Sequence, residues 1–207
     1  MYAVESSYAP VLAFWFGPLP DEAALPTAMA RRWFEKSAVF DEEIRARFNS
    51  EIQQASRGEL ASWSAEPRGT LALLILIDQM RRNIYRDQAA AFAADSRALS
   101  YCLDGLATGQ DQALYPVERI FFYLPLEHAE SLALQERSVD LFTRLARNLP
   151  PGAPTVLRDF FDATLDFAVR HRDIVARFGR FPHRNAVLRR PTTEEEAVFL
   201  QGPGSGF

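Results

Sequence analysis

The sequence predicts an all-α protein made of stacked antiparallel helix pairs, arranged as an α-solenoid or an irregular helical bundle. Three observations lead to this prediction. Apolar residues recur at helical spacing almost throughout, and no segment shows the alternation of a half-buried strand. Glycine and proline divide the chain into segments of helical length joined by short connections. No helical repeat of about 34 residues is found, so we expect the pairs to stack without sequence repeats.

Start and stop signals define the helices of the first half. Gly17-Pro18 ends a short first helix, and Asp41 is expected to cap a longer helix that Gly58 stops. An apolar central helix follows Pro67, and an alanine-rich helix comes after it. The helices expected in this half span residues 8–16, 27–36, 41–56, 59–65, 70–82 and 88–107.

Prolines mark the helix boundaries that are expected in the second half of the chain. Pro116 suits a first helical turn, whereas Pro125 is expected to break that helix. Residues 150–152 form a tight linker before a long helix, and two overlapping capping boxes, at 192–195 and 193–196, predict a last one. The helices expected here span residues 116–123, 127–148 and 155–177, with the last beginning near 192.

Length and composition favour a single soluble domain. The chain has 207 residues, and we place the domain at residues 1–201 and a disordered tail at 202–207. The lone cysteine, Cys102, cannot pair within the chain and is expected to be a buried, reduced thiol. No signal peptide opens the sequence and no apolar run reaches spanning length, so we expect a cytoplasmic protein.

Asp78 interrupts the most apolar helix of the chain. It follows the apolar run at 71–77, which is expected to be buried on all sides. Because an uncompensated buried carboxylate would cost several kcal/mol, Asp78 must be paired. One reading is an ion pair with Arg82, one turn further on, at the point where the helix emerges to solvent. The other is a substrate-facing acid, which the many donor side chains of residues 78–86 keep open.

Two histidines are expected to point into the core. His171 lies on the predicted core stripe of the long helix, either as a hydrogen-bonded core residue or as a ligand or base, and burial favours its neutral form. Pro125 would place Glu127 and His128 in the first turn of the next helix. The helix dipole would then disfavour protonation of His128.

The segment 178–185 predicts a stiff, polar corner after the long helix. If it folds back over the 127–128 corner and the 78–86 strip, acids, imidazoles and guanidiniums form a concave cluster that could bind an anion or amide, or do acid–base work. Equally, the basic segment and the acidic corner could simply neutralise each other. The candidate ligand-binding residues are Asp78, Arg82, Asn83, Glu127, His128, His171, Arg180, His183, Arg184 and Asn185.

Other chemistries lack the residues they need. The three histidines lie on separate segments without metal-site spacing, and neither a phosphate-binding glycine loop nor a nucleophile elbow is present. We therefore expect no metal and no cofactor, and catalytic roles stay unassigned, with His128, His171 and His183 as weak candidates. The net charge of −4 argues against broad nucleic-acid binding, although seven arginines between 170 and 190 allow a local RNA contact.

Three motifs in order resemble the bacterial family called domain of unknown function 924. They are Asp78-Gln79-Met80-Arg81-Arg82-Asn83-Ile84-Tyr85-Arg86, Pro125-Leu126-Glu127-His128-Ala129-Glu130, and residues 178–185 followed by Thr192-Thr193-Glu194-Glu195. The resemblance covers nearly the whole chain and implies an all-helical fold similar to the tetratricopeptide-like superfamily, but no activity. Arg81 stands where proline is commoner in the family, so the helix is expected to continue to Asn83.

The leading functional hypothesis is a protein that binds a small anionic or amide ligand in an Arg/His/Asn pocket, with an acid–base enzyme as one form of it. The alternative is a helical interaction module for a peptide or protein, and the weaker alternative is a local RNA contact. No membrane partner is expected, and a homodimer is compatible with the sequence.

Overall fold

The computed structural model describes residues 7–19, 21 and 24–206. All regular elements among these residues are helical, and none of them forms a strand, which confirms the all-α prediction. The α-helices are α1 (Ala9–Phe16), α2 (Thr27–Phe34), α3 (Ala38–Arg57), α4 (Pro67–Leu74), α5 (Arg81–Ile84), α6 (Asp95–Ala107), α7 (Pro116–Glu127), α8 (Leu132–Arg147), α9 (Thr155–Phe178) and α10 (Glu194–Leu200).

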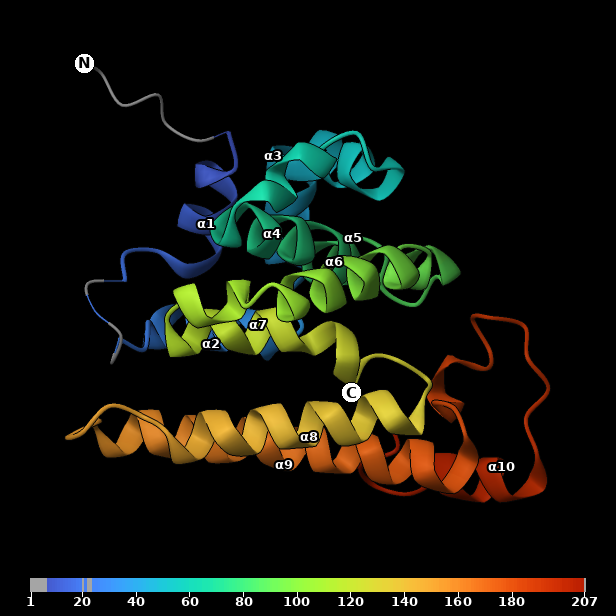
Figure 1. Cartoon of the computed structure of the whole chain (residues 1–207). Helices are drawn as coiled ribbons and strands as arrows, with labels where there is room; N and C mark the ends of the chain where they lie inside the picture. Colours follow the sequence, from blue (N-terminus) through green and yellow to red (C-terminus); the bar gives the residue numbers. More distant parts are fainter. Residues whose placement is uncertain (1–6, 20, 22–23, 207) are drawn as a thin grey trace, which may run out of the picture.

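Two long helices form one side of the molecule. α8 and α9 run antiparallel along each other, and α7 lies between this pair and the upper helices α3, α4, α5 and α6 (Figure 1). The segment 179–193 loops out at one end of the α8–α9 pair and leads into α10 (Figure 1). This end of the molecule, where α7 also finishes, carries most of the predicted site residues.

Aromatic side chains join the first helices to α7. The ring of Phe121 packs edge-on against Trp15, Phe16 and Trp33, at centroid distances of 5.6, 5.4 and 4.8 Å. Trp33 also donates its indole hydrogen to the backbone carbonyl of Trp15 at 2.9 Å. Such clusters contribute packing beyond their buried area, so α1, α2 and α7 are fixed to one another.

A smaller core holds the 179–193 segment in place. Phe181 is fully buried against Ile174 and Val175 of α9, and the partly buried Phe178 and Phe199 pack beside them. Phe199 belongs to α10, so this second core attaches both the segment and the last helix to the end of α9.

The central helix is longer than the sequence predicts and changes its winding. It begins at Pro67, turns into a π-helical segment over Ile75–Met80 and ends as α5 at Ile84. The expected continuation to Asn83 is therefore confirmed. Every residue of the π-helical segment is buried.

Two predicted helix boundaries are wrong. Pro125 does not break its helix but lies inside α7, which continues to Glu127. The cost of the missing backbone hydrogen bond is offset by packing, because all residues from Ile120 to Glu127 are buried. The alanine-rich stretch 88–107 is divided into a 3₁₀ turn at Ala89–Phe92 and α6.

The cap of α3 also differs from the prediction. Ser37, rather than Asp41, is the N-cap, and its hydroxyl accepts a hydrogen bond from the backbone N–H of Phe40 at 3.3 Å. Asp41 lies in the first turn and its carboxylate pairs with Arg86. Gly58 ends the helix in the left-handed conformation, as expected.

Removing this cap should destabilise the protein slightly. We expect Ser37→Ala to lower the free energy of unfolding by about 1 kcal/mol, because the amide of Phe40 loses its acceptor. Urea denaturation measures the change. Ser50→Ala, an exposed substitution inside the same helix, should have no such effect, and equal losses in both variants would contradict the capping role of Ser37.

The last helix begins as the second capping box predicts. The side chain of Thr193 accepts from the amide of Glu196, and the carboxylate of Glu196 accepts from the amide of Thr193. Residues 201–205 make turns and bends after α10, and Ser205 donates to the carbonyl of Leu200 at 3.2 Å. The end of the expected tail, Phe207, lies outside the described residues.

Candidate functional site

Asp78 lies on the π-helical segment and is almost completely buried, with 1% of its surface exposed. One extra residue per turn in such a segment displaces the side chains that follow, and π segments are frequent at functional sites. This winding could not be predicted from the sequence, because the apolar run before Asp78 is equally compatible with a regular α-helix.

The Asp78 carboxylate has three side-chain partners. Oδ1 accepts hydrogen bonds from Arg82 Nη2 at 3.1 Å and from His128 Nδ1 at 2.8 Å, and Gln79 donates to Oδ2. Burial by itself would raise the pKa of Asp78, but His128 and Arg82 outweigh it and hold the pKa well below its usual range. The carboxylate is therefore ionised. The predicted ion pair with Arg82 exists, and His128 is a partner that the sequence did not reveal.

Glu127 and His128 lie at the end of α7, not in the first turn of α8 as predicted. Glu127 is the last residue of α7, and His128 is its C-cap. The error follows from Pro125, which the helix tolerates, and it reverses the dipole argument, because the C-terminal end of a helix favours a cation. Gln135 of α8 is fully buried and donates to the carbonyls of Glu127 and Ala129, at 2.6 and 2.7 Å, which holds this end in place.

The imidazole of His128 is oriented by Asp78. Because the carboxylate is ionised, it accepts the hydrogen on Nδ1 and leaves Nε2 as the atom with a lone pair. Burial, followed by the nearby Arg82 guanidinium, lowers the pKa of His128 despite the opposing effect of Asp78. The side chain is 15% exposed, so this ring is not sealed off from solvent.

His171 of α9 pairs with Glu127, next to the Asp78–His128 pair. The two side chains approach to 3.1 Å, and His171 Nδ1 also lies 2.8 Å from the carbonyl of Phe167. Burial and the charge of Asp78 raise the pKa of Glu127 to about 8, and burial and His128 lower the pKa of His171 to about 2. Both side chains are therefore neutral at pH 7, and the rings of His128 and His171 lie 6.3 Å apart.

The burial of His171 confirms the prediction, although the predicted core stripe is displaced. The buried stripe of α9 runs through Leu157, Phe161, Thr164, Ala168 and His171, whereas the expected Ala163 and Phe167 are exposed. His171 belongs to both stripes, and its ring contacts Glu127 at the end of α7 and Phe181 of the segment 179–193.

The segment 179–193 reaches back to the end of α7, as the cluster hypothesis required. Arg184, in the short 3₁₀ turn Pro182–Arg184, donates from Nη1 to the carbonyl of His128 at 3.0 Å. Its guanidinium lies over the rings of Phe181 and Phe92, at 4.4 and 4.8 Å from their centroids. Burial, together with Arg82, lowers the pKa of Arg184 to about 10, so that it remains a cation.

His183 completes the group. Its ring lies 5.7 Å from that of Phe181, and the ring of His171 lies 5.5 Å from the same phenylalanine. Burial and the neighbouring Arg184 lower the pKa of His183 to about 4. The ring of Phe181 therefore contacts both histidines and Arg184.

Seven predicted residues thus come together, with Asp95 as an eighth member that the sequence analysis missed. We call this set the polar cluster: Asp78, Arg82, Asp95, Glu127, His128, His171, His183 and Arg184. Asp95 is the first residue of α6 and pairs with Arg82 at 2.9 Å and with Arg184 at 3.6 Å. Asp95 falls inside the continuous helix expected at 88–107, so its position at the start of a helix could not be predicted.

Three other predicted residues have different partners. Asn83 donates to Asp41 of α3 at 2.8 Å. Arg180 and Asn185 both bind the carboxylate of Glu196 at the start of α10, with Arg180 Nε at 2.7 Å from Oε1. The structure does not bring these three side chains into the polar cluster.

Ion pairs neutralise most of the basic stretch at 170–190. Outside the polar cluster, its arginines pair with carboxylates in five ion pairs, Arg170–Asp166, Arg172–Asp173, Arg177–Glu195, Arg180–Glu196 and Arg190–Glu130. This pairing weakens the electrostatic argument for an RNA contact.

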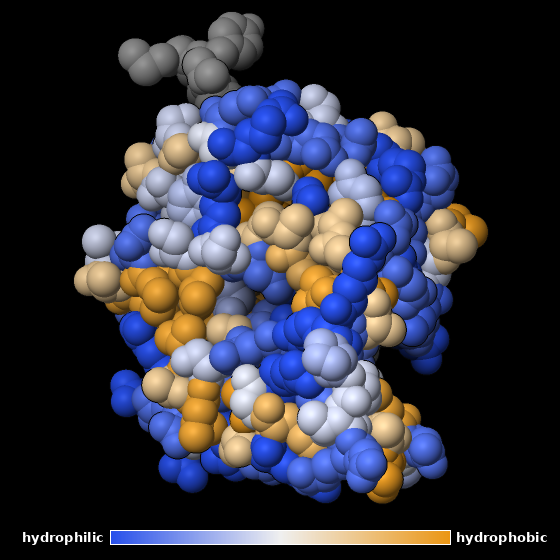
Figure 2. Space-filling model, turned by 90° about the vertical axis from the view of Figure 1, so that its right-hand side faces the viewer, coloured by the Kyte–Doolittle hydropathy of each residue, from blue (hydrophilic) through white to orange (hydrophobic). Residues whose placement is uncertain are grey.

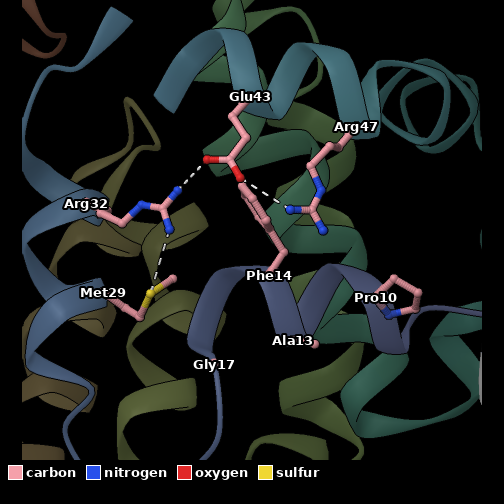
Figure 3. Close-up of a pocket in the computed structure, with 8 residues that line it drawn as sticks. All are labelled: Pro10, Ala13, Phe14, Gly17, Met29, Arg32, Glu43 and Arg47. Atoms are coloured by element: carbon pink, nitrogen blue, oxygen red, sulfur yellow. Dashed lines mark hydrogen bonds and ion pairs between the residues drawn. The ribbon is translucent and has the colours of Figure 1, made fainter. Parts of the chain in front are cut away.

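Two open hollows are among those on the described surface, and the polar cluster lines neither of the two. One, of about 380 Å³, lies between α1, α2 and α3 and has Phe14 and Met29 in its lining (Figure 3). Glu43 stands between Arg32 and Arg47 there, at 2.6 and 3.3 Å, so both guanidiniums are already paired (Figure 3). The other, of about 290 Å³, lies on α6 beside Tyr101.

No three histidine, cysteine, aspartate or glutamate side chains of the described chain come together as a metal site. Cys102 is buried, and burial raises its pKa far above that of an exposed thiol. Within residues 7–19, 21 and 24–206, no helix combines the length and the apolar character needed to cross a bilayer.

Known proteins resemble this chain both in sequence and in fold. Residues 11–204 match the family described as "Bacterial protein of unknown function (DUF924)". The chain belongs to this family. Its fold is similar to the solved structure of the protein of unknown function ATU0120 from Agrobacterium tumefaciens, with 37% sequence identity and a TM-score of 0.76. The alignment covers 94% of this chain and 97% of that one. No curated protein matches the chain.

The three motifs of the DUF924 resemblance meet in the polar cluster. Asp78 and Arg82 come from the first, Glu127 and His128 from the second, and His183 and Arg184 from the third. The structure therefore gives a physical reason why these separated stretches occur together in one chain: each supplies charged or imidazole groups to the same buried network.

Proposed function

We propose that this protein binds a small anionic or amide-bearing ligand at the polar cluster. The observation that carries the proposal is the Asp78–His128 pair, in which a buried carboxylate fixes the tautomer of a partly exposed imidazole. In such a pair the carboxylate orients the ring, and Nε2 can accept a hydrogen bond or a proton.

The energetics of the cluster support this proposal. Buried ion pairs contribute little net stability, because desolvation opposes the attraction between the charges, and apolar packing of the same volume would often be as stable. The cluster nevertheless holds two acids, two arginines, three histidines and a neutral glutamic acid near the end of α7. Groups with strongly shifted pKa values in one place are typical of functional sites.

His128 is the side chain of the cluster best suited to acid–base work. Its Nδ1 is held by Asp78, and its lowered pKa leaves Nε2 unprotonated at neutral pH. A ligand whose proton reaches Nε2 could transfer it there, and Arg82 or Arg184 could stabilise the resulting negative charge. If the protein is an enzyme, we therefore assign the proton transfer to His128.

A ligand screen tests the proposal. Thermal unfolding of the wild-type protein should shift upward with at least one member of a panel of phosphorylated, carboxylated and amide metabolites. His128→Gln should abolish that shift, because a glutamine amide can still donate to Asp78 but offers no imidazole Nε2. Arg47→Gln, in the hollow between α1, α2 and α3, should leave the shift unchanged.

Two outcomes would contradict the proposal. One is a panel in which no compound stabilises the protein. The other is a ligand whose effect survives His128→Gln but is lost with Arg47→Gln, which would place binding in the hollow of Figure 3.

The alternative of an interaction module depends on exposed apolar surface. The exposed large apolar side chains are distributed over several helices: Phe34, Val39, Leu132, Val156, Phe167 and Val198. On the side shown in Figure 2, orange apolar areas are interleaved with blue hydrophilic ones. A mixed surface of this kind favours the ligand proposal over a large apolar docking face.

A further inference from the structure

Two guanidiniums of the polar cluster share one carboxylate. Arg82 Nη2 lies 2.9 Å from Asp95 Oδ1, and Arg184 Nη1 lies 3.6 Å from Asp95 Oδ2. The two arginines therefore address opposite oxygens of the same group. This is the arrangement in which two arginines hold a carboxylate or a phosphate of a ligand.

The donors of these arginines are not all used. Nε of Arg82 and Nε of Arg184 are both buried, and neither has a hydrogen-bond partner among the described residues. Arg184 is only 5% exposed, and its contact with Asp95 is longer than a hydrogen bond. A buried donor without an acceptor is costly, so the site has capacity for further oxyanion oxygens.

The guanidiniums are held in position by aromatic rings. The ring centroid of Phe92 lies 5.2 Å from the guanidinium of Arg82 and 4.8 Å from that of Arg184, and the ring of Phe181 lies 4.4 Å from that of Arg184. Little side-chain entropy would therefore be lost when an anion binds. Asp95 itself is 25% exposed, so an anion can approach the pair from the position of its carboxylate.

Asp95 places one negative charge beside the positive charges of Arg82 and Arg184. Arg82 has a second carboxylate partner in Asp78, whereas Asp95 is the single carboxylate within ion-pair distance of Arg184 among the described residues. Without Asp95, the two guanidiniums would repel each other across a partly buried space.

We propose that Arg82 and Arg184 form a clamp for an oxyanion, a phosphate or carboxylate group, and that Asp95 occupies the clamp until the ligand displaces it. This inference rests on the proposed function and narrows the ligand class from anions and amides to oxyanions. Asp95 acts as an internal competitor, which weakens binding of simple anions and reserves the clamp for ligands with additional contacts.

Asp95→Asn tests the clamp directly. The variant keeps the shape of the side chain but removes the competing charge, so inorganic phosphate should bind about tenfold more tightly than to the wild-type protein. Calorimetric titration with potassium phosphate, at an ionic strength matched with potassium chloride, measures the dissociation constants. A parallel titration with potassium acetate distinguishes a preference for phosphate from a preference for carboxylate.

Matched variants make the result specific. Asp140→Asn removes a carboxylate from an exposed pair with Arg144 and should leave phosphate binding at the wild-type level. Arg184→Gln in the Asp95→Asn background should abolish the gain. If Asp95→Asn does not fold, Arg184→Gln alone serves as the second test, because it should remove the phosphate-induced rise in Tm of the wild-type protein.

The results distinguish a failure of the clamp proposal from a failure of the proposed function. Equal affinities of Asp95→Asn and wild type for both phosphate and acetate would overturn the clamp, even if metabolites stabilise the wild type through His128. A gain in oxyanion affinity that depends on Arg184, together with a metabolite panel that has no effect, would support the clamp and count against the proposed function.

Discussion

Asp78→Asn should lower the free energy of unfolding by roughly 3–5 kcal/mol, the effect expected when one partner of a buried ion pair is removed. Asp78 is 1% exposed, and its carboxylate accepts hydrogen bonds from Arg82 and His128. Asparagine keeps the volume but removes the buried charge that pairs with both Arg82 and His128, and leaves Arg82 with Asp95 as its carboxylate partner. Urea denaturation at pH 7, followed by circular dichroism, measures the loss.

An exposed pair in the same geometry provides the control. Asp140 and Arg144 on α8 also form an i,i+4 pair, at 2.7 Å, but their side chains are 54% and 69% exposed. Asp140→Asn should change the free energy of unfolding by less than about 0.5 kcal/mol. If the two variants lose similar stability, the buried carboxylate of Asp78 contributes no more than an exposed one, and the ion pairs of the polar cluster do not stabilise the fold.

Glu127→Gln should make the protein more stable at pH 8, and the gain should disappear toward pH 4.5. The pKa of Glu127 is raised from 4.5 to about 8 by burial and by Asp78. Between these values the folded state keeps a proton that the unfolded state releases, so stability falls as the pH rises. Each unit of pKa shift corresponds to about 1.4 kcal/mol, which makes the expected difference at pH 8 several kcal/mol.

The histidines define the pH window in which this effect is visible. The pKa values of His171 and His183 are lowered from 6.5 to about 2 and about 4, so their contribution to stability is lost as the pH falls below 6.5. Between pH 6.5 and 8 the wild-type protein should therefore lose stability through Glu127, whereas the Glu127→Gln variant should not.

Denaturant unfolding at a series of pH values measures both profiles. Glu136→Gln, which changes an exposed glutamate of α8, should give a profile parallel to that of the wild type. If the Glu127→Gln profile is also parallel to the wild-type profile between pH 6.5 and 8, then Glu127 is ionised in the folded protein and the neutral Glu127–His171 pair does not exist.

The sequence was a good guide to the helices and a poor guide to their ends. Apolar spacing and the positions of Gly17, Gly58 and Pro116 located the corresponding helices, because local backbone preferences act there without much tertiary influence. Pro125 misled the prediction, because burial of the neighbouring side chains stabilises a helix that proline locally disfavours.

The same distinction applies to the polar cluster. Asp78, His171 and Arg184 stood out because polar residues in apolar or aromatic surroundings must find partners. The sequence could not assign those partners: Arg180 and Asn185 bind Glu196, while the more distant Asp95 joins Arg82 and Arg184.

Taken alone, the sequence determined the all-α class, the pairing of Asp78 with Arg82, the burial of His171, and the three stretches that contribute to the polar cluster. These follow from periodicity and from the cost of burying unpaired polar groups, which are properties of short segments. Only the tertiary structure decided that His128, at the end of α7, orients toward Asp78 and that Asp95 lies between two guanidiniums. Such contacts join residues far apart in the chain, and packing of the helices, not local preference, sets their geometry.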